Sequence, residues 1–595
     1  MRPVRVPARV GSWRGSLLTW WNGPAARPRR GARVRGGRPA GSVRDVCCGP
    51  CAPKSPCVAW YCCQPRSSVC ATVTAYTGAG PPTSGLHGLA GPGFLVRQWF
   101  FPTWLPGGAR VSAVSSHAVA LRGFRCWWPQ NAWRGSLCRE TALKEGSLPF
   151  GVDSSVHTID RRAFIDNSVL DIEFDRVFHP SWQFLGFAGE VREPGDYVVR
   201  MLGRDEVVVI RGEDGEVRAL HNSCTHRGTR LCRASLGNTA HLRCSYHGWT
   251  FANDGRLAGV PALRSGYPPD FDHAGHDLPA ARVTSRRGFL FATWDPHAPD
   301  LAEYLGEIAW YLDALLDCGG GEWEVCGPPQ RVRAKGNWKI PTDNFAGDGY
   351  HMRTTHQIAL DQGIYGDTLA DGTRGRAGTD LTAVNIATPA GHSVRAGYVI
   401  DSGHSLEDRD PAAPQFPGYP PERWAELAAA QTPEQVRFTS HCEVAHGVVF
   451  PNTAFLSVAH DRAVGEESDP LTRYLVVRSH VPVSARETEC LYWTLVPTAM
   501  DPQWRRRSYR FQARTQSAGG ILFEMDDFEN FARIDDALAR SAPGRGGPVD
   551  LTLGAGLGTP ARDFPGPGRA EVATLSEHNQ RAFYRRWSAL VGELP

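Results

Sequence analysis

The sequence predicts an α+β chain of 595 residues in which a small all-β domain is inserted into a larger domain of helices and strands. Between residues 185 and 298, short runs rich in β-branched and aromatic residues, separated by Gly and Asp turns, indicate the small domain. In residues 151–184 and 299–595, helical patterns alternate with strand-like runs, which indicates the larger domain. In residues 1–150 the apolar residues follow neither a helical nor a strand spacing, and we expect these residues to lack regular structure.

These first 150 residues, called the leader below, have an unusual composition. Asp45 is the only acidic residue before Cys138, and nine of the 16 cysteines and nine of the 19 tryptophans precede Phe150. Three interpretations are open: a disulfide-rich secreted module, an Arg-rich transit peptide, and upstream sequence translated ahead of a natural start near Gly151 or Val152. We favour the last interpretation, because frequent Gly and Pro residues would break a transit helix repeatedly.

The next elements are one helix and a series of strands. Apolar residues at helical spacing predict a helix over Asp160–His179. Strands are expected at residues 197–201, 206–210, 217–220, 249–251 and 288–294. Asp214-Gly215 is a hairpin-type turn between two of them.

Two short Cys/His motifs fall between these strands. Cys224-Thr-His226 and Cys244-Ser-Tyr-His247 are separated by seventeen residues. Two thiolates and two imidazoles in such pairs are typical of a [2Fe–2S] cluster with mixed ligation, in which neutral histidines raise the reduction potential. A zinc knuckle is the alternative, but zinc sites more often use C-x2–4-C and H-x3–5-H pairs. Iron–sulfur thiols also argue against a secreted, oxidising location for the leader.

The larger domain is expected to contain two further helices around an antiparallel sheet. A helix over Leu301–Leu316 places Leu305, Ile308, Leu312 and Leu315 on one face. The segment Ser576–Val591 predicts the C-terminal helix. Strands are predicted at residues 448–450, 455–458, 474–478 and 489–496.

A second candidate metal motif lies in the segment Thr342–His356. His351 and His356 with one distant carboxylate would form a facial triad for Fe(II), which leaves one coordination face open. On a continuous helix, Asn344, Asp348 and His351 would share a face. Because His356 follows five residues later, the helix is expected to unwind near Thr354-Thr355.

The two motifs, in this order and at this separation, resemble the α subunits of Rieske non-haem iron aromatic-ring-hydroxylating dioxygenases over residues 152–595. The resemblance implies a Rieske domain at 185–298, and a helix-grip catalytic domain made of 151–184 and 299–595. It implies that Cys224, His226, Cys244 and His247 bind the cluster. It further implies that His351 and His356 bind a mononuclear Fe(II). The third iron ligand would come from the acidic segment Gly519–Asn530, with Asp527 as the better match and Asp526 as the fallback.

By the same resemblance, Asp348 corresponds to an aspartate that bridges one subunit's cluster to the next subunit's iron, and Asn344 is a second catalytic candidate. The oligomer would be an α3 ring or an α3β3 complex with a small β subunit. Electrons would come from a ferredoxin or reductase, and NAD(P)H would act only through that partner. The implied reaction inserts both atoms of O2 into an aromatic ring and gives a cis-dihydrodiol. Two alternatives remain open: a Rieske monooxygenase or demethylase, and a Rieske electron-transfer protein.

The substrate pocket is expected to be mostly apolar. By position, six residues are candidates for its lining: Asn344, Phe345, Met352, His446, Leu456 and Phe523. His446 departs from an apolar lining, so the sequence leaves open whether the substrate is a neutral hydrocarbon or an aromatic carboxylate.

Composition limits the other partners. A net charge of +4 gives no reason to expect a nucleic-acid partner. The sequence contains no run of eighteen apolar residues, so no membrane span is expected. The run Gly554-Ala-Gly-Leu-Gly558 is followed by Thr559-Pro560 rather than by a helix, so a dinucleotide site is not expected. We therefore expect a cytoplasmic protein.

Overall fold

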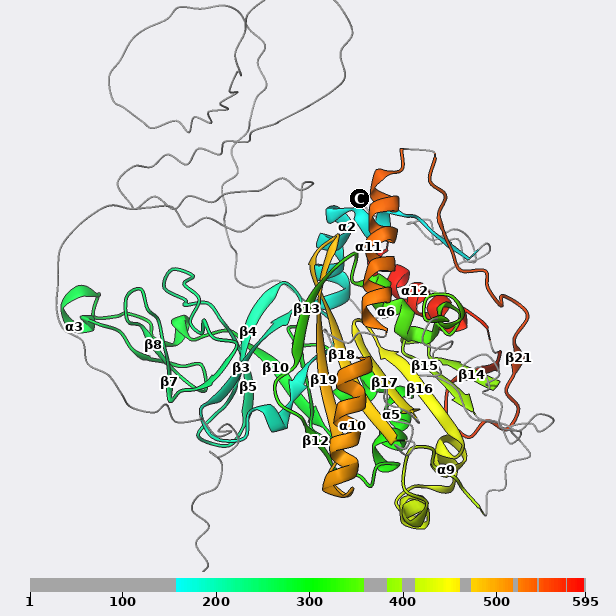
Figure 1. The fold of residues 1–595 in the computed structure, drawn as a ribbon. Helices are drawn as coiled ribbons and strands as arrows, with labels where there is room; N and C mark the ends of the chain where they lie inside the picture. Colours follow the sequence, from blue (N-terminus) through cyan, green and yellow to red (C-terminus); the bar gives the residue numbers. More distant parts are fainter. Residues whose placement is uncertain are drawn as a thin grey trace, which may run out of the picture. The chain divides into compact units, whose positions relative to one another are not determined.

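The computed structural model describes residues 157–357, 382–398, 413–460, 472–516, 523–542, 545–573 and 575–592 (Figure 1). The leader lies outside the described residues. The α+β architecture expected from the sequence is confirmed, because an all-β domain is followed by a large antiparallel sheet packed against helices. Within the described ranges, every helix is too short or too polar to span a membrane.

The small domain consists of two antiparallel sheets. The larger sheet has the strand order β2-β11-β10-β5-β4-β3-β6. Its strands are β2 (Gln183–Phe187), β3 (Asp196–Leu202), β4 (Asp205–Arg211), β5 (Val217–His221), β6 (Leu236–Asn238), β10 (Ala280–Arg286) and β11 (Phe289–Thr293). The smaller sheet contains β7 (His241–Arg243), β8 (Thr250–Ala252) and β9 (Leu257–Gly259). The expected hairpin between β4 and β5 is present, and Gly215 has the positive φ (83°) that its turn requires.

The larger domain is built on a ten-stranded antiparallel sheet. Its main path is β12-β19-β18-β17-β16-β15-β14-β22-β21, and β13 also pairs with β19. The bounds are β12 (Trp323–Val325), β13 (Gln330–Lys335), β14 (Thr382–Ala387), β15 (Ser393–Tyr398), β16 (Cys442–Val449), β17 (Thr453–His460), β18 (Thr472–Ser484), β19 (Glu487–Pro497), β21 (Thr559–Pro560) and β22 (Arg569–Val572).

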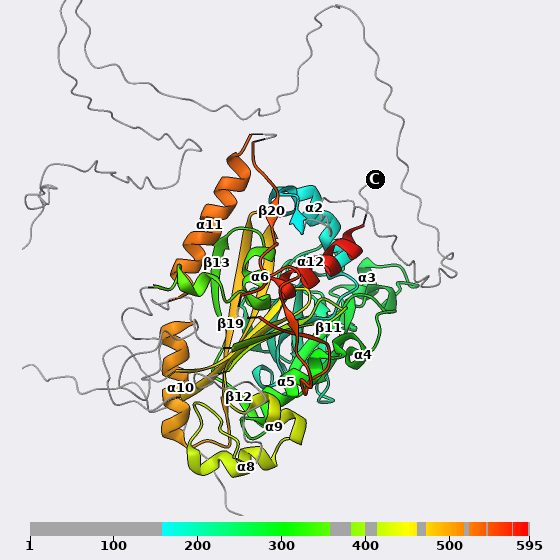
Figure 2. The same cartoon turned by 90° about the vertical axis from the view of Figure 1, so that its right-hand side faces the viewer.

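Helices pack against this sheet and against one another. α6 (Lys339–Gly347) packs on β15 to β18, and α12 (His578–Val591) lies beside α6 in both views (Figures 1 and 2). α10 (Pro502–Thr515) packs on β18 and β19, and α11 (Glu524–Arg540) packs near β13. Asn344 and Phe345, at the C-terminal end of α6, line one cavity together with residues of β16, β17 and the start of α11.

Two of the expected long helices are interrupted. The segment Asp160–His179 divides into α1 (Arg162–Ile165), α2 (Asn167–Glu173) and a π-helical turn (Phe174–Phe178). Asp166 causes the first break, since its extended backbone and side chain cap α2. The helix expected over 301–316 divides into α4 (Leu301–Leu305) and α5 (Ile308–Asp317) at Gly306, whose φ is 48°.

A buried charged pair joins α2 to α6 within the larger domain. The carboxylate of Glu173 lies 2.5 Å from Nζ of Lys339, and both side chains are 0% exposed. The indole N–H groups of Trp338 and Trp587 donate to the same carboxylate at 2.8 and 2.7 Å. Glu173 therefore ties the segment before the small domain to the first residues of α6 and to α12.

A buried histidine of the larger domain is held in its neutral form. His392 is 1% exposed, its Nδ1 accepts from the backbone N–H of Phe450 at 2.9 Å, and its Nε2 lies 2.9 Å from the carbonyl of Tyr304. Both ring nitrogens are thus satisfied in the neutral form. Burial lowers the pKa of His392 to about 4.

We expect the pH dependence of the free energy of unfolding to report the burial of His392. The folded pKa lies below the ordinary value near 6.5, so the stabilisation is complete above about pH 6.5 and is lost as the pH falls toward 4. Between about pH 6.5 and pH 4, the free energy of unfolding of His392→Gln should fall by roughly 3 kcal/mol less than that of the wild type. Urea unfolding at several pH values measures both. Equal pH slopes for the two proteins would show that His392 is not responsible.

Candidate iron centres

The two Cys/His motifs occupy loops of the same design in the small domain. The first loop, which starts at Cys224, is closed by a bridge between Ser223 and Arg230, and the second is the tip of the β7–β8 hairpin. In each loop a glycine four residues after the cysteine donates its N–H to the cysteine carbonyl, Gly228 at 2.8 Å and Gly248 at 3.1 Å. Both glycines have φ near 75°, a conformation that fits Gly best.

The loops bring the four predicted cluster residues together. The rings of His226 and His247 have centroids 4.7 Å apart, and Cys224 and Cys244 are 2% and 3% exposed. Trp249 stacks on His226 at 4.7 Å, which fixes the plane of that ring. Burial disfavours the Cys244 thiolate, but the backbone N–H groups of Tyr246 and His247 outweigh this and lower its pKa.

These side chains fit a metal cluster rather than a hydrogen-bonded core. Nδ1 of His226 and Nδ1 of His247 are both buried, and neither has a hydrogen-bond partner among the described residues. Buried polar atoms in native proteins are nearly always bonded, so paired orphan nitrogens beside two buried thiols indicate metal ligands.

The second centre starts where α6 ends. The sequence prediction that Asn344, Asp348 and His351 share one helical face is wrong, because α6 stops at Gly347 and Asp348 has an extended backbone (ψ 99°). The carboxylate of Asp348 accepts from the N–H groups of Tyr350 (2.8 Å) and His351 (3.2 Å), which replaces the helix by a turn. The helix thus ends before His351, and the short 3-10 turn His351–Arg353 that follows ends at Thr354, where unwinding was expected.

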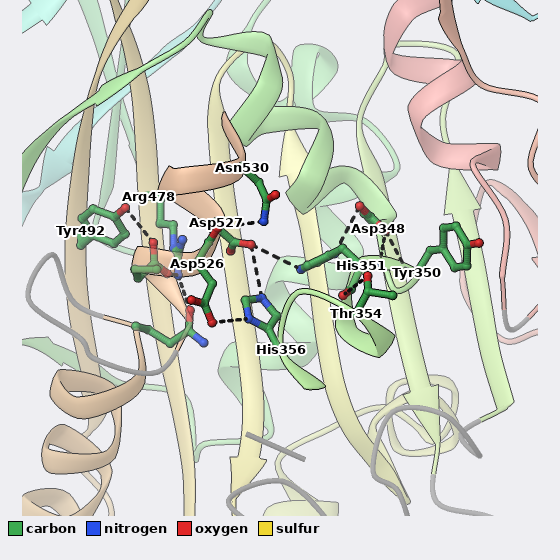
Figure 3. A network of polar contacts seen from close by, with 12 residues as sticks. Asp348, Tyr350, His351, Thr354, His356, Arg478, Tyr492, Asp526, Asp527 and Asn530 are labelled. Atoms are coloured by element: carbon green, nitrogen blue, oxygen red, sulfur yellow. Dashed lines mark hydrogen bonds and ion pairs between the residues drawn. The ribbon is translucent and has the colours of Figure 1, made fainter. Parts of the chain in front are cut away.

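The segment after α6 and the first turn of α11 bring the side chains of His351, His356 and Asp527 to one point (Figure 3). Nε2 of His356 lies 3.3 Å from Oδ1 of Asp527, and Nε2 of His351 lies 3.8 Å from the same oxygen. One donor atom from each residue lies within 4.8 Å of the others. The separations are long for hydrogen bonds but suit three ligands around one ion, with two imidazoles and a carboxylate as for Fe(II).

The structure distinguishes between the two candidate aspartates. Asp527 is 11% exposed and faces both histidines, whereas Asp526 is 44% exposed and reaches only Nδ1 of His356, at 3.9 Å. Asp527 is therefore the third ligand, and the fallback residue Asp526 is not. The start of the predicted acidic segment, residues 519–522, lies outside the described residues.

A buried network holds the first turn of α11, which carries Asp527. Glu524 lies 2.5 Å from the guanidinium of Arg478 and accepts from the Tyr492 hydroxyl at 2.9 Å. The same guanidinium donates to Gln516 and lies over the ring of Phe345, 4.1 Å from its centroid. Asp527, one turn after Glu524, is positioned by these contacts.

Asp348 is also close to the metal ligands. Its Oδ2 lies 3.2 Å from Nδ1 of His351, on the opposite side of the ring from Asp527. Burial opposes ionisation of Asp348, but its contacts with His351 and the turn N–H groups lower its pKa to about 2. A carboxylate in this position fixes the orientation of a ligating histidine.

A cavity opens beside the three ligands. Its lining includes all six residues selected from the sequence: Asn344, Phe345, Met352, His446, Leu456 and Phe523. His446 is fixed by a contact of its Nδ1 with the carbonyl of Phe345 at 3.1 Å. Sequence reasoning missed the polar residues Arg395, Glu443 and Gln516 of the same lining, for which no motif exists. It also missed Gly228 and Gly248, although their equal spacing from each cysteine was a usable signal.

Comparisons with known families agree with both centres. A family described as the Rieske [2Fe-2S] domain matches residues 181–279. A family described as the ring-hydroxylating α subunit, catalytic domain, matches residues 301–593. Together with the His351–His356–Asp527 site, these matches define a Rieske non-haem iron oxygenase. An electron carrier with a cluster alone would lack this second domain, which rules out that alternative.

Individual relatives cover most of the chain. This chain is 31% identical to the N,N-dimethyl phenylurea N-demethylase subunit alpha of Sphingobium sp. (strain YBL2), over 77% of its own length and 94% of that protein. It is 32% identical to the chlorobenzene dioxygenase subunit alpha of Cupriavidus sp. (strain PS12), over 73% and 91%. A crystal structure of naphthalene 1,2-dioxygenase from Rhodococcus sp. bound to indole matches with a TM-score of 0.67 and 33% identity, over 74% and 96%. The chain belongs to the family of Rieske aromatic-ring-hydroxylating dioxygenase α subunits.

Proposed function

We propose that this chain is the oxygenase α subunit of a multicomponent dioxygenase that inserts both atoms of O2 into an aromatic ring to give a cis-dihydrodiol. The observation that carries the proposal is the cavity beside His351, His356 and Asp527, in which an apolar part is formed by Phe345, Met352, Val444, Leu456 and Phe523. Such a lining suits a flat hydrocarbon ring held close to the metal. Several relatives, including the chlorobenzene and naphthalene enzymes, bear the names of dioxygenases of aromatic compounds.

The residues divide into an electron-accepting site and an oxygen-reacting site. Cys224, His226, Cys244 and His247 would hold the [2Fe–2S] cluster, and His351, His356 and Asp527 would hold Fe(II). When bound, the two centres supply stored electrons and the activation of dioxygen. The chain's own contribution is to orient the iron ligands through Asp348 and Glu524, and to line a cavity that shields the aromatic ring from water.

The proposal includes the partners that the resemblance implies. A ferredoxin or reductase would reduce the cluster, so NAD(P)H would act only through that protein. The α chains would form an α3 ring, or α3β3 with a small β subunit, in which Asp348 passes electrons from a neighbouring subunit's cluster. Asn344, in the last turn of α6 and in the cavity lining, would assist at the iron. We place the complex in the cytoplasm, where thiols stay reduced.

A second candidate is a monooxygenase or demethylase with the same two centres. One observation favours it: the relative from Sphingobium, 31% identical over 77% of this chain, is named for N-demethylation of a phenylurea. Both reactions use the same metals, so the difference lies in how the cavity presents the substrate.

Product analysis under ¹⁸O₂ separates the two. Purified protein reconstituted with a ferredoxin and a reductase should convert at least one arene of a panel to a cis-dihydrodiol that carries two labelled oxygen atoms. A phenol with one labelled atom, or dealkylation of N-methylated arenes without any diol, would replace the proposed reaction by the second candidate.

Asp348 provides a test of the electron path. Asp348→Asn should keep both iron centres but lower turnover by about 10- to 100-fold, because the amide cannot orient and polarise His351 as the carboxylate does. Iron and sulfide analysis checks retention of the metals, and the rate of cluster reoxidation in the presence of substrate and O2 checks the path.

A matched control uses Glu577, whose pKa is raised by burial and by the charge of Asp348, and whose carboxylate accepts from the N–H of Leu553. Glu577→Gln should turn over within about twofold of wild type. Full activity of Asp348→Asn would show that Asp348 is not needed for electron transfer to the mononuclear iron.

A further inference from the structure

A buried arginine lies among the carboxylates of the iron site. Arg395 is 5% exposed and lies in β15, directly opposite His446 of β16. The carboxylates of Asp348, Glu443 and Asp527 line the same cavity as this guanidinium. Because arginine is almost never buried unless it is paired, these acidic surroundings indicate that the charge of Arg395 serves the protein itself.

Asp348 is the carboxylate whose charge acts on Arg395. Burial lowers the pKa of Arg395 to about 10, and attraction to the ionised Asp348 opposes this decrease. Arg395 therefore keeps its charge at physiological pH. Opposite charges attract more strongly in a buried region than at the surface, because the surrounding dielectric is low. The guanidinium thus stabilises the Asp348 carboxylate where it lies, with Oδ2 3.2 Å from Nδ1 of His351.

The guanidinium also lies against the residue that follows Asp348. A Cβ atom at Gly349 would be 2.5 Å from Nη2, 2.6 Å from Cζ and 2.9 Å from Nε of Arg395. These distances are well below van der Waals contact, so a side chain at position 349 would displace the guanidinium. Glycine at this position therefore lets Arg395 pack directly on the turn that leads from Asp348 to His351.

The other side of the iron site is supported in a similar way. Arg478 lies 2.5 Å from Glu524, and this buried pair holds the first turn of α11, which carries Asp527. Arg395 has the corresponding place beside the turn of Asp348. Each of the two segments that supply iron ligands is thus backed by a buried arginine next to a carboxylate.

Building on the proposed function, in which Asp348 passes electrons to the mononuclear iron, we propose that Arg395 and Gly349 together position Asp348 for this step. Arg395 attracts the carboxylate, and Gly349 gives the guanidinium its place on the turn. One electron leaves the reduced cluster and reaches the iron site, and no bond of Arg395 forms or breaks. Arg395 is therefore a positioning residue that acts through Asp348.

The first test observes the iron site without substrate. Each variant is loaded with Fe(II) and treated with nitric oxide, and the EPR spectrum of the ferrous centre is compared with that of wild type. Arg395→Gln and Gly349→Ala should change the symmetry of this signal in the same way, because both remove the guanidinium from the turn. Arg395→Lys should give a spectrum closer to wild type. Gly189→Ala is the control, since a Cβ at Gly189 meets nothing within 4 Å, and its spectrum should not change.

The second test measures electron transfer. The reduced cluster is reoxidised by O2 together with the arene that the labelled-oxygen experiment shows to be converted. Per mononuclear iron, reoxidation should slow by about 10- to 100-fold in Arg395→Gln and by at least about threefold in Gly349→Ala. Arg395→Lys should recover part of the rate. A loss of iron with an unchanged spectrum and rate for the remaining iron would mean that Arg395 is only structural, which would overturn the proposal.

Combined variants decide whether both residues act through Asp348. Arg395→Gln added to Asp348→Asn, or to Gly349→Ala, should slow reoxidation by no more than about twofold beyond the slower of the two single variants. Multiplicative effects in either combination would show that the residues act independently and would contradict the proposal.

Failure of this inference is distinguishable from failure of the proposed function. Wild-type spectra and rates in Arg395→Gln and Gly349→Ala, with a slow Asp348→Asn, would reject the role of Arg395 and leave the electron path in place. Wild-type rates in all three variants would reject both. The labelled products decide the type of oxygenation independently of either result.

Discussion

Replacement of Asp527 by alanine is expected to remove one iron atom per chain and to lower product formation by on the order of 100-fold or more. Asp527 is the only carboxylate among the described residues that faces Nε2 of both His351 and His356, at 3.8 and 3.3 Å. Without it, two neutral imidazoles would have to hold a divalent ion without a charged ligand. Iron and sulfide analysis, together with the visible spectrum of the cluster, measures the loss.

The neighbouring aspartate is the control for this variant. Asp526→Ala removes a carboxylate of the same helix turn that is 44% exposed and only reaches 3.9 Å from Nδ1 of His356. It should retain the mononuclear iron and activity within about threefold of wild type. If instead Asp526→Ala loses iron and Asp527→Ala keeps it, the ligand assignment is wrong.

The second large effect concerns stability. Glu173→Gln should lower the free energy of unfolding by about 3–5 kcal/mol, because it leaves the ammonium of Lys339 buried and unpaired. Lys339→Met should have a similar effect by leaving the carboxylate uncompensated except for the two indole donors. Urea unfolding followed by fluorescence measures both changes.

The double variant and a surface pair make the test specific. Glu173→Gln combined with Lys339→Met should recover much of the loss, since no unpaired charge remains. Asp171 lies on the same helix as Glu173 and forms an exposed pair with Arg204. Asp171→Asn breaks this pair and should change the free energy of unfolding by less than about 0.5 kcal/mol. Single variants that cost no more than this surface control would show that the buried pair does not anchor α2.

Local motifs explain why so much of both centres was predictable from the sequence. The cluster residues lie in two loops, each closed by its own hydrogen bonds, so their spacing along the chain carries their geometry. His351 and His356 are likewise close in sequence. The strands at β16 to β19 were predictable from their β-branched residues, because their side chains pack in the interior.

Features that neither a hydrophobic pattern nor a motif encodes were not predictable in the same way. The end of α6 depends on the side chain of Asp348 accepting from its own turn, and a helical pattern does not reveal this. The resemblance favoured Asp527 and kept Asp526 as a fallback, and only the packing of α11 distinguishes the two. Arg395 belongs to no motif; only the register of β15 against β16 places it beside the iron ligands.

The metal content of the purified wild-type protein tests the central claim most directly. A chain with a Rieske cluster and a separate mononuclear site should contain about three iron atoms and about two acid-labile sulfides, and no stoichiometric zinc. Zinc in place of sulfide and iron at the four Cys and His side chains, or a chain with the cluster irons alone after reconstitution with Fe(II), would contradict the account.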